Sequence, residues 1–248
     1  MAKIRVDIAL VDRGLVETRT KAQALIMAGV VFSGETKITK AGHQIKEDTA
    51  LEVRGKDHPW VSRGGLKLEK GLAEFNIALK GSTVIDVGAS TGGFTDVALE
   101  NGAAKVFAVD VGRGQLAWKL RNDERVTVLE KTNARYLTRD HIPEPVDLVV
   151  CDASFISLKT VLPAALSFVK PGGALIALIK PQFEVGRENV GKGGVVRDPE
   201  LHAAVCEDIR VWLDALPGWR AVGITESPIK GPEGNIEFLI CGQKSHDG

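Results

Sequence analysis

The stretch from Thr83 to Thr95 constrains the fold of this chain more than any other part of the sequence. It opens with a short apolar run typical of a buried parallel strand, continues into a glycine-rich loop, and is followed at 96–100 by residues of helical composition. Strand, glycine loop and helix in this order form a nucleotide-sized pocket in a doubly wound sheet, and Asp86 stands where the strand meets the loop. We therefore expect a ligand at this loop, although a turn without a ligand fits the same pattern.

The spacing of the glycines indicates which nucleotide the loop would hold. Gly88 is separated from Gly92-Gly93 by three other residues, so the loop lacks the middle glycine that makes room for a pyrophosphate. S-adenosylmethionine (SAM) has no phosphate. A second apolar run, at 105–109, ends in Asp110, about 20 residues beyond the loop, where a carboxylate can accept hydrogen bonds from both ribose hydroxyls. The pattern favours SAM and leaves a dinucleotide-dependent oxidoreductase as the weaker alternative.

Composition narrows the class of protein. The 248 residues suffice for one large domain or for a medium domain with a small partner, and the formal net charge is zero, so any nucleic acid must be met by a local basic surface. The three cysteines have no CxxC spacing and no histidine cluster nearby, which argues against a disulfide framework or a metal site. The N-terminus is charged and no apolar run approaches the ~20 residues of a membrane span, so we expect a cytoplasmic protein without membrane contact.

The first part of the chain, to about Lys56, has a pattern of its own. Apolar residues at helical spacing predict helices starting near Val6 and Thr18, and short strands are expected at 30–32, 37–38 and 51–53. Four cations gather in the helical pair: Arg5, Arg13, Arg19 and Lys21. By themselves they fit a solvated surface and a nucleic-acid contact equally well. A polar stretch containing Pro59 then predicts a linker.

Three stretches of this segment stand out, namely Arg5-Val6-Asp7, 15–22 (LVETRTKA) and 26–31 (IMAGVV). Together they resemble the small RNA-binding module of ribosomal small-subunit protein four, which also occurs in pseudouridine synthases. The resemblance implies that Arg13, Arg19 and Lys21 lie on a face that grips structured RNA, and we count Arg5 with them as a candidate. Backbone phosphates would supply most of that affinity, with little reading of base sequence.

From residue 83 onward strands and helices alternate, which predicts an α/β fold with one mostly parallel sheet. The expected strands are 83–87, 105–109, 125–129, 146–151, 174–179, 222–226 and 236–241, with helices at 160–170 and 199–213. Asp152 and Lys180 follow the fourth and fifth strands, so both should project into the crevice that holds the glycine loop. A buried Lys–Asp pair is costly unless it is functional or well satisfied, and we interpret this pair as functional.

An amphipathic helix is expected just before the first strand of the sheet. Leu68, Leu72 and Phe75 give it an apolar face, and Lys67 lies one position to the side. Spacing alone predicts that Lys67 is solvated, as lysines on such helices usually are.

Besides the N-terminal module, five motifs stand out along the chain: 62–68 (SRGGLKL), 86–95 (DVGASTGGFT), 151–155 (CDASF), 179–184 (IKPQFE) and 234–238 (GNIEF). Taken together they resemble the TlyA family of SAM-dependent RNA 2′-O-methyltransferases, also labelled haemolysin A and related to the FtsJ-type enzymes. The resemblance covers nearly the whole chain. It departs slightly at His58-Pro59, where the family usually has a basic and a small residue before Trp-Val.

The resemblance implies a fold, a site and a cofactor. The fold would be a Rossmann-like seven-stranded SAM-methyltransferase sheet at 64–248, joined through a linker at 57–63 to an RNA-binding domain at 1–56. A catalytic Lys-Asp-Lys-Glu tetrad would fall on Lys67, Asp152, Lys180 and Glu237, which replaces the solvated interpretation of Lys67. SAM would be held by Asp86, by Gly88, Gly92 and Phe94 on the methionine side, by Asp110 at the ribose and by Asn133 near the adenine. No metal is required.

This tetrad suits methyl transfer to a ribose hydroxyl, which must lose its proton as it attacks. Lys180 is the candidate base, although an ordinary lysine titrates near ~10.4 and must be made neutral first. We therefore expect a cytoplasmic enzyme that methylates ribosomal RNA, free or within ribosomal subunits, and we favour a monomer. The rival hypotheses are a non-catalytic RNA-binding or ribosome-assembly factor and, less favoured, a haemolysin.

Overall fold

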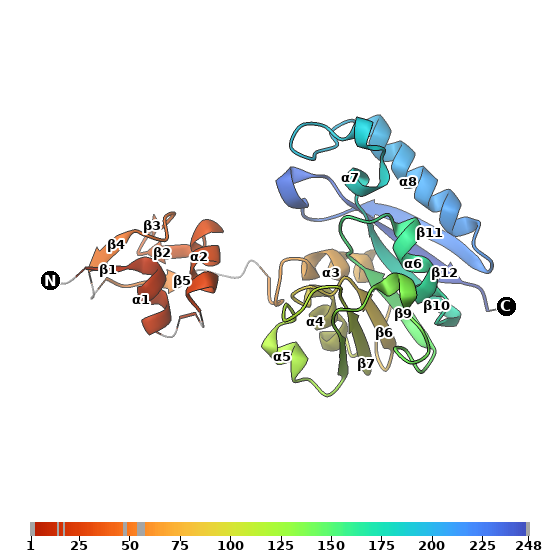
Figure 1. Ribbon diagram of the computed structural model, residues 1–248, viewed down its shortest axis with the longest axis horizontal. Helices are drawn as coiled ribbons and strands as arrows, with labels where there is room; N and C mark the ends of the chain where they lie inside the picture. Colours follow the sequence, from red (N-terminus) through yellow and green to blue (C-terminus); the bar gives the residue numbers. More distant parts are fainter. Residues whose placement is uncertain (1–2, 14, 17, 47–48, 54–57, 247–248) are drawn as a thin grey trace. The chain divides into compact units, whose positions relative to one another are not determined.

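The computed structural model describes residues 3–13, 15–16, 18–46, 49–53 and 58–246. The chain divides into two compact units, 1–59 and 60–248, and each is described by itself (Figure 1). The predicted linker at 57–63 begins at Asp57, which lies outside the described residues. In the part of the chain that is described, no helix has the length and apolar character needed to cross a membrane.

The N-terminal unit packs two helices against short antiparallel strands. Its elements are β1 (Lys3–Arg5), α1 (Val6–Asp12), α2 (Arg19–Met27), β2 (Val31–Ser33), β3 (Thr36–Lys37), β4 (Gln44–Lys46) and β5 (Glu52–Val53). β2 pairs with β3 and β5, while β1 pairs with β4 through Ile4 opposite Ile45. The β1–β4 pair was not predicted, because three-residue strands are too short to show an alternating pattern. Val6, Leu10 and Ile26 form the centre of this unit's core.

The second unit is built on a seven-stranded sheet. Its strands are β6 (Thr83–Val87), β7 (Lys105–Val109), β8 (Val126–Leu129), β9 (Val146–Cys151), β10 (Val169–Ile179), β11 (Trp219–Glu226) and β12 (Phe238–Lys244). They lie in the order β11-β12-β10-β9-β6-β7-β8. The pairs from β10 to β8 are parallel, and β12 pairs antiparallel with both β10 and β11. The strand order reverses between β6 and β9, which is where doubly wound sheets bind their ligands.

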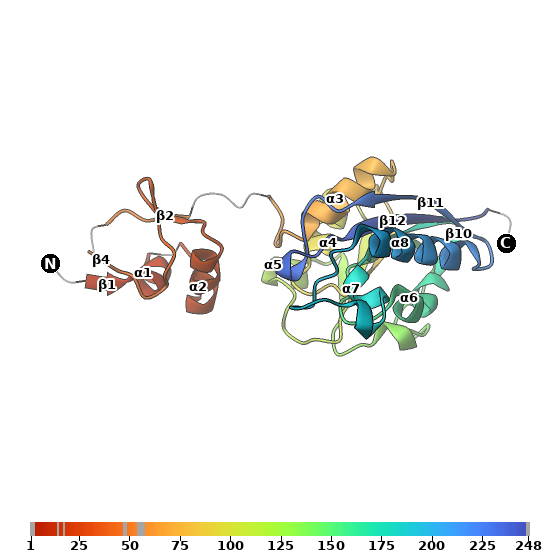
Figure 2. The same ribbon diagram turned by 90° about the horizontal axis from the view of Figure 1, so that it is seen from above.

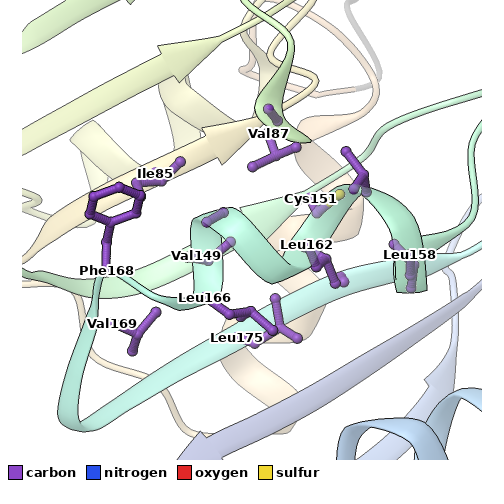
Figure 3. Packing of buried hydrophobic residues seen from close by; sticks show 14 of the residues in the cluster. Ile85, Val87, Val149, Cys151, Leu158, Leu162, Leu166, Phe168, Val169 and Leu175 are labelled. Atoms are coloured by element: carbon purple, nitrogen blue, oxygen red, sulfur yellow. The ribbon is translucent and has the colours of Figure 1, made fainter. Parts of the chain in front are cut away.

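Helices cover both faces of this sheet (Figure 2). One face carries α3 (Gly65–Glu74), α4 (Gly93–Glu100) and α5 (Trp118–Arg121), whose apolar residues join one core cluster. The other face carries α6 (Leu158–Leu166) and α8 (Pro199–Asp214), with the short turns η1 (Ala134–Tyr136), α7 (Pro181–Glu184), η2 (Arg187–Asn189) and η3 (Pro232–Gly234) in the connections. Figure 3 shows Leu158, Leu162 and Leu166 of α6 packed over the β6–β9–β10 part of the sheet.

The predicted boundary between α6 and β10 is wrong by several residues. The helix was expected to reach Lys170, but it ends at Leu166 and β10 already begins at Val169. Phe168 turns its ring into the core, and Val169 pairs with Val146 of β9. The Pro171-Gly172-Gly173 stretch expected to close the helix therefore lies within β10, where the pairing with β9 shifts register between Val169 and Ala174.

Candidate active site

Four charged side chains from distant parts of the chain meet at one end of the sheet. Lys67 lies on α3, Asp152 follows β9, Lys180 follows β10, and Glu237 directly precedes β12. Lys180 Nζ lies 2.7 Å from Asp152 Oδ1. Lys67 Nζ lies 2.6 Å from Glu237 Oε2 and 3.4 Å from Asp152 Oδ2. The four therefore alternate in charge, in the order Glu237, Lys67, Asp152, Lys180.

The position of Lys67 follows from how α3 packs. Its buried residues include Leu68 and Leu72, and its Gly71 lies against Ile176 of β10. Because Gly71 has no side chain, the helix approaches the sheet closely and Lys67 lies on the covered side, only 6% exposed. The solvated position predicted from spacing alone is therefore wrong.

The charged side chains of this cluster are largely buried. Lys180 is 6% exposed and Glu237 is 1% exposed, so both are largely withdrawn from water and need partners. Lys180 Nζ also donates to the backbone oxygen of Asp152 at 3.1 Å and to Ser154 Oγ at 2.9 Å. Ser154 was not among the predicted site residues: it lies in the 151–155 motif, but a serine after a strand is by itself typical of a turn.

Two adjoining cavities lie along the carboxyl end of the sheet. The first, about 310 Å³, has the tetrad residues Lys67, Asp152 and Lys180 in its wall. The second, about 420 Å³, is bounded by the β7 and β8 ends of the sheet. Both cavities are lined by Gly88, Ser90, Asp152 and Ser154, so these residues form their common boundary.

Five of the six predicted cofactor residues line these cavities. Asp86, Gly88 and Phe94 border the first, and Asp110 and Asn133 border the second, with Gly88 in both. Gly92 borders neither. It precedes α4 with φ of 99°, and a Cβ there would lie 2.3 Å from the Leu120 side chain. Gly92 thus faces the α5 side of the core and shapes the loop instead of lining the cavity.

The carboxyl group of Asp86 has a strongly raised pKa. Its side chain is fully buried, Oδ2 accepts a hydrogen bond from Thr95 Oγ1 at 2.6 Å, and Oδ1 has no partner among the described residues. Burial raises the pKa of Asp86 to about 7, and repulsion from the Asp152 and Asp110 carboxylates adds to the shift, against the Thr95 hydrogen bond. An unpartnered buried acceptor in a cavity wall indicates a missing donor.

Asp110 organises the loops around the second cavity. Its carboxylate accepts backbone N–H hydrogen bonds from Ser90 and Gly112, both at 2.7 Å. It therefore ties the glycine loop to the segment that follows β7. Asn133 accepts from the Arg135 N–H, as an ordinary turn residue does, while also bordering the cavity.

Two of the four cations predicted to bind RNA are joined by a buried carboxylate. Asp7 is fully buried and accepts hydrogen bonds from Arg5 Nε and Arg19 Nε, each at 2.9 Å, and from Gln23. The hydrogen bond from Arg5 is the largest cause that holds the pKa of Asp7 well below its usual range. Both arginines remain partly exposed, at 39% and 53%.

The other two cations lie on the helices and the turn between them. Arg13 follows α1 and donates to the backbone oxygen of Thr49 at 2.5 Å. Lys21 lies on the exposed side of α2, where its backbone N–H donates to the Thr18 hydroxyl that caps the helix.

Comparison with known proteins agrees with both units. Residues 60–244 match the FtsJ-like methyltransferase family, and residues 4–51 match the S4 domain. The chain is 49% identical to the 16S/23S rRNA (cytidine-2′-O)-methyltransferase TlyA of Mycobacterium tuberculosis, over 96% of this chain and 89% of that one. It is 52% identical to a protein of Bacillus subtilis named as an rRNA methyltransferase, YqxC, over 96% and 85%.

A solved structure agrees as well. A protein of Streptococcus thermophilus named as a hemolysin superposes with a TM-score of 0.77 at 45% identity, over 99% of this chain and 90% of that one. The predicted seven-stranded methyltransferase fold and the resemblance to TlyA are thus confirmed. This chain belongs to the FtsJ-like methyltransferase family and carries an S4 domain at its N-terminal end.

Proposed function

We propose that this protein transfers the methyl group of SAM to a ribose 2′-hydroxyl of ribosomal RNA. The observation that carries the proposal is the alternating cluster of Lys67, Asp152, Lys180 and Glu237, of which the first three border a cavity beside the glycine loop. Two relatives of the chain bear names of rRNA methyltransferases, one of them specified as 2′-O. We assign the reaction to the cytoplasm and place the S4-type domain at 1–56, the linker at 57–63 and the catalytic domain at 64–248.

The residues present fit SAM. The unpartnered Asp86 Oδ1 suits the ammonium of the methionine part, and Gly88, at φ of 81°, leaves the loop without a side chain between the two cavities. Asp110 borders the second cavity, where its carboxylate would accept hydrogen bonds from the ribose hydroxyls, and Asn133 would border the adenine. SAM, when bound, supplies a methyl group on a positively charged sulfur.

Lys180 is the residue we assign as the base. Its Nζ would take the proton of the 2′-hydroxyl while the ribose oxygen forms its bond to the methyl carbon; the bond from that carbon to sulfur would break, and its electron pair would leave the sulfur neutral. Asp152 and Ser154 hold this amine in place through contacts of 2.7 Å and 2.9 Å. Lys180 also borders the first cavity, so it shares that space with the glycine loop.

Glu237 and Lys67 would support Asp152 and Lys180 without taking the proton of the hydroxyl themselves. Glu237 is buried and does not border the cavity, but it holds Lys67 at 2.6 Å. Lys67 borders the cavity and touches Asp152, so it balances that carboxylate's charge. This division of roles leaves Asp152 to orient Lys180 and gives the substrate oxygen a cationic neighbour.

The N-terminal unit is the part we assign to RNA recognition. Arg5 and Arg19 are held together by their shared partner Asp7, and we assign Arg13 and Lys21 to the same RNA-binding face. Such a face suits the phosphates of structured RNA. Replacing Arg19 and Lys21 together by alanine should weaken RNA binding and reduce its salt dependence, and unchanged affinity with an unchanged salt slope would exclude this face.

The decisive experiment measures transfer of labelled methyl from SAM to small subunits, large subunits and free ribosomal RNA. Wild-type protein should label RNA, and Lys180→Ala should not, while SAM binding persists. Lys159→Ala serves as the matched control, since Lys159 is half-exposed and pairs with Asp208 instead of the tetrad. RNA binding without label from the wild type would favour an assembly factor, and full turnover by Lys180→Ala would remove Lys180 as the base.

A further inference from the structure

Asp152 and Lys180, which we call the reactive pair, lie on two turns that are side by side. The first, 152–157, follows β9 and contains Asp152 and Ser154. The second, 180–184, follows the neighbouring strand β10 and contains Lys180 and α7. Because the pair spans the two turns, its geometry depends on how firmly the turns are held together.

The first turn contains a residue, Phe155, whose backbone conformation is unfavourable by itself. Phe155 has φ of 65°, in the left-handed region that aromatic residues rarely adopt. Its side chain is 88% exposed, and its ring centroid lies 5.0 Å from that of Phe183 in the second turn. A conformation of this kind persists only where surrounding contacts impose it.

Glu184 supplies such a contact. It ends α7, and its Oε1 accepts a hydrogen bond from the backbone N–H of Leu158 at 2.8 Å, where the first turn enters α6. Burial raises the pKa of Glu184, while hydrogen bonds from Ser157 and Leu158 oppose the shift. The Glu184 carboxylate, at the end of the second turn, therefore binds the backbone at the end of the first turn.

This contact is additional to the normal cap of α6. Ser157 is the N-cap residue, and its hydroxyl already accepts the Lys159 N–H at 3.2 Å. Glu184 lies 26 residues later in the chain than Leu158, so its hydrogen bond joins separate segments. With Lys180 bound to Asp152 at the other end, the two turns are joined at both ends of 152–157.

We propose that Glu184 is a positioning residue for methyl transfer, which holds the turn 152–157 against the turn 180–184 so that Asp152 and Lys180 stay in reactive contact. This inference rests on the proposed function. Glu184 borders neither cavity, so its effect passes through the turns and not through contact with RNA or SAM.

The test compares Glu184→Ala with Glu184→Gln in the full-length protein. Alanine removes the acceptor of the Leu158 N–H, and kcat should fall about tenfold, the equivalent of one hydrogen bond to a charged group. KM for the RNA and the dissociation constant for SAM should stay within about twofold, since no binding group is lost. Glutamine keeps an oxygen acceptor at the same place and should restore most of kcat.

Asp198→Ala is the matched control. Asp198 also accepts a backbone N–H near the start of a helix, that of Glu200 at 2.9 Å in α8, and borders neither cavity. It should lower Tm without changing kcat per folded molecule. A kcat that is normal in Glu184→Ala, or reduced equally in Asp198→Ala, would overturn the assignment.

Amide hydrogen exchange gives a readout independent of turnover. In Glu184→Ala, exchange at 154–158 should accelerate, whereas in Asp198→Ala it should not. If wild-type protein transfers no methyl, the proposed function fails, and the exchange data decide separately whether Glu184 holds the turn. Unchanged exchange in Glu184→Ala would refute the positioning role in either case.

Discussion

Affinity for SAM should fall as the solution is acidified below pH 7, because Asp86 must be a carboxylate to pair with the ammonium of SAM. In the free protein the fully buried Asp86 has its pKa raised to about 7, and its Oδ1 lacks a partner. A group with a raised pKa keeps its proton to higher pH, so protonated Asp86 competes with binding on the acid side.

The magnitude follows from that pKa. If SAM binds only the ionised form, the apparent dissociation constant rises by the factor 1 + 10^(pKa − pH), which is about 1.1 at pH 8 and about 11 at pH 6. We therefore expect about tenfold weaker binding at pH 6 than at pH 8, and release of about half a proton per SAM bound at pH 7. The proton release follows because pairing with the ammonium lowers the pKa of Asp86.

Isothermal titration calorimetry in two buffers of different ionisation enthalpy measures both quantities. Asp86→Asn should bind SAM weakly, with an affinity that is flat between pH 6 and 8 and without proton release. Asp123→Asn changes a carboxylate held by Arg125 far from the cavities and should behave as wild type. Equal wild-type affinity at pH 6 and 8 would refute the role of Asp86.

Two further predictions concern stability. The hydrogen bond from Arg5 lowers the pKa of Asp7, so the stability that Asp7 contributes is present at neutral pH and is lost as the pH falls below ~4. Between pH 7 and pH 3 the Tm of the wild type should therefore fall further than the Tm of Asp7→Asn. Gly92→Ala should cost about 1–3 kcal/mol more than Gly81→Ala in urea unfolding. Both glycines have positive φ, but only at Gly92 would a Cβ meet side chains, those of Leu116 and Leu120; equal losses would contradict the packing argument.

The sequence predicted those site residues whose position depends on topology. Asp152 and Lys180 each follow an apolar run, and parallel strands bring their carboxyl ends to one edge, so their meeting was expected. Asp110 was predicted by the same argument, because it follows the apolar run at 105–109. All three positions depend on the backbone alone, which the period of the apolar residues specifies.

Residues whose position depends on packing could not be predicted from spacing. Lys67 is drawn to the site because Gly71 lets α3 approach Ile176, and spacing had placed its side chain in water. Gly88 and Gly92 share a loop and a positive φ, yet only Gly88 borders the cavities. Glu184 lies within the 179–184 motif, but its contact could not be predicted, because its partner is a backbone N–H in another segment.

The order of charges in the tetrad explains why two lysines are present where one base is needed. Lys67 satisfies the buried Glu237 at 2.6 Å and approaches Asp152 only at 3.4 Å, so Asp152 remains closely paired with Lys180 at 2.7 Å. A single lysine could not reach both carboxylates at such distances, and the buried one would then lack a partner. With Lys67 bound closely to Glu237, Asp152 is left to hold the Lys180 amine, so one lysine balances a buried charge and the other is held at the cavity wall.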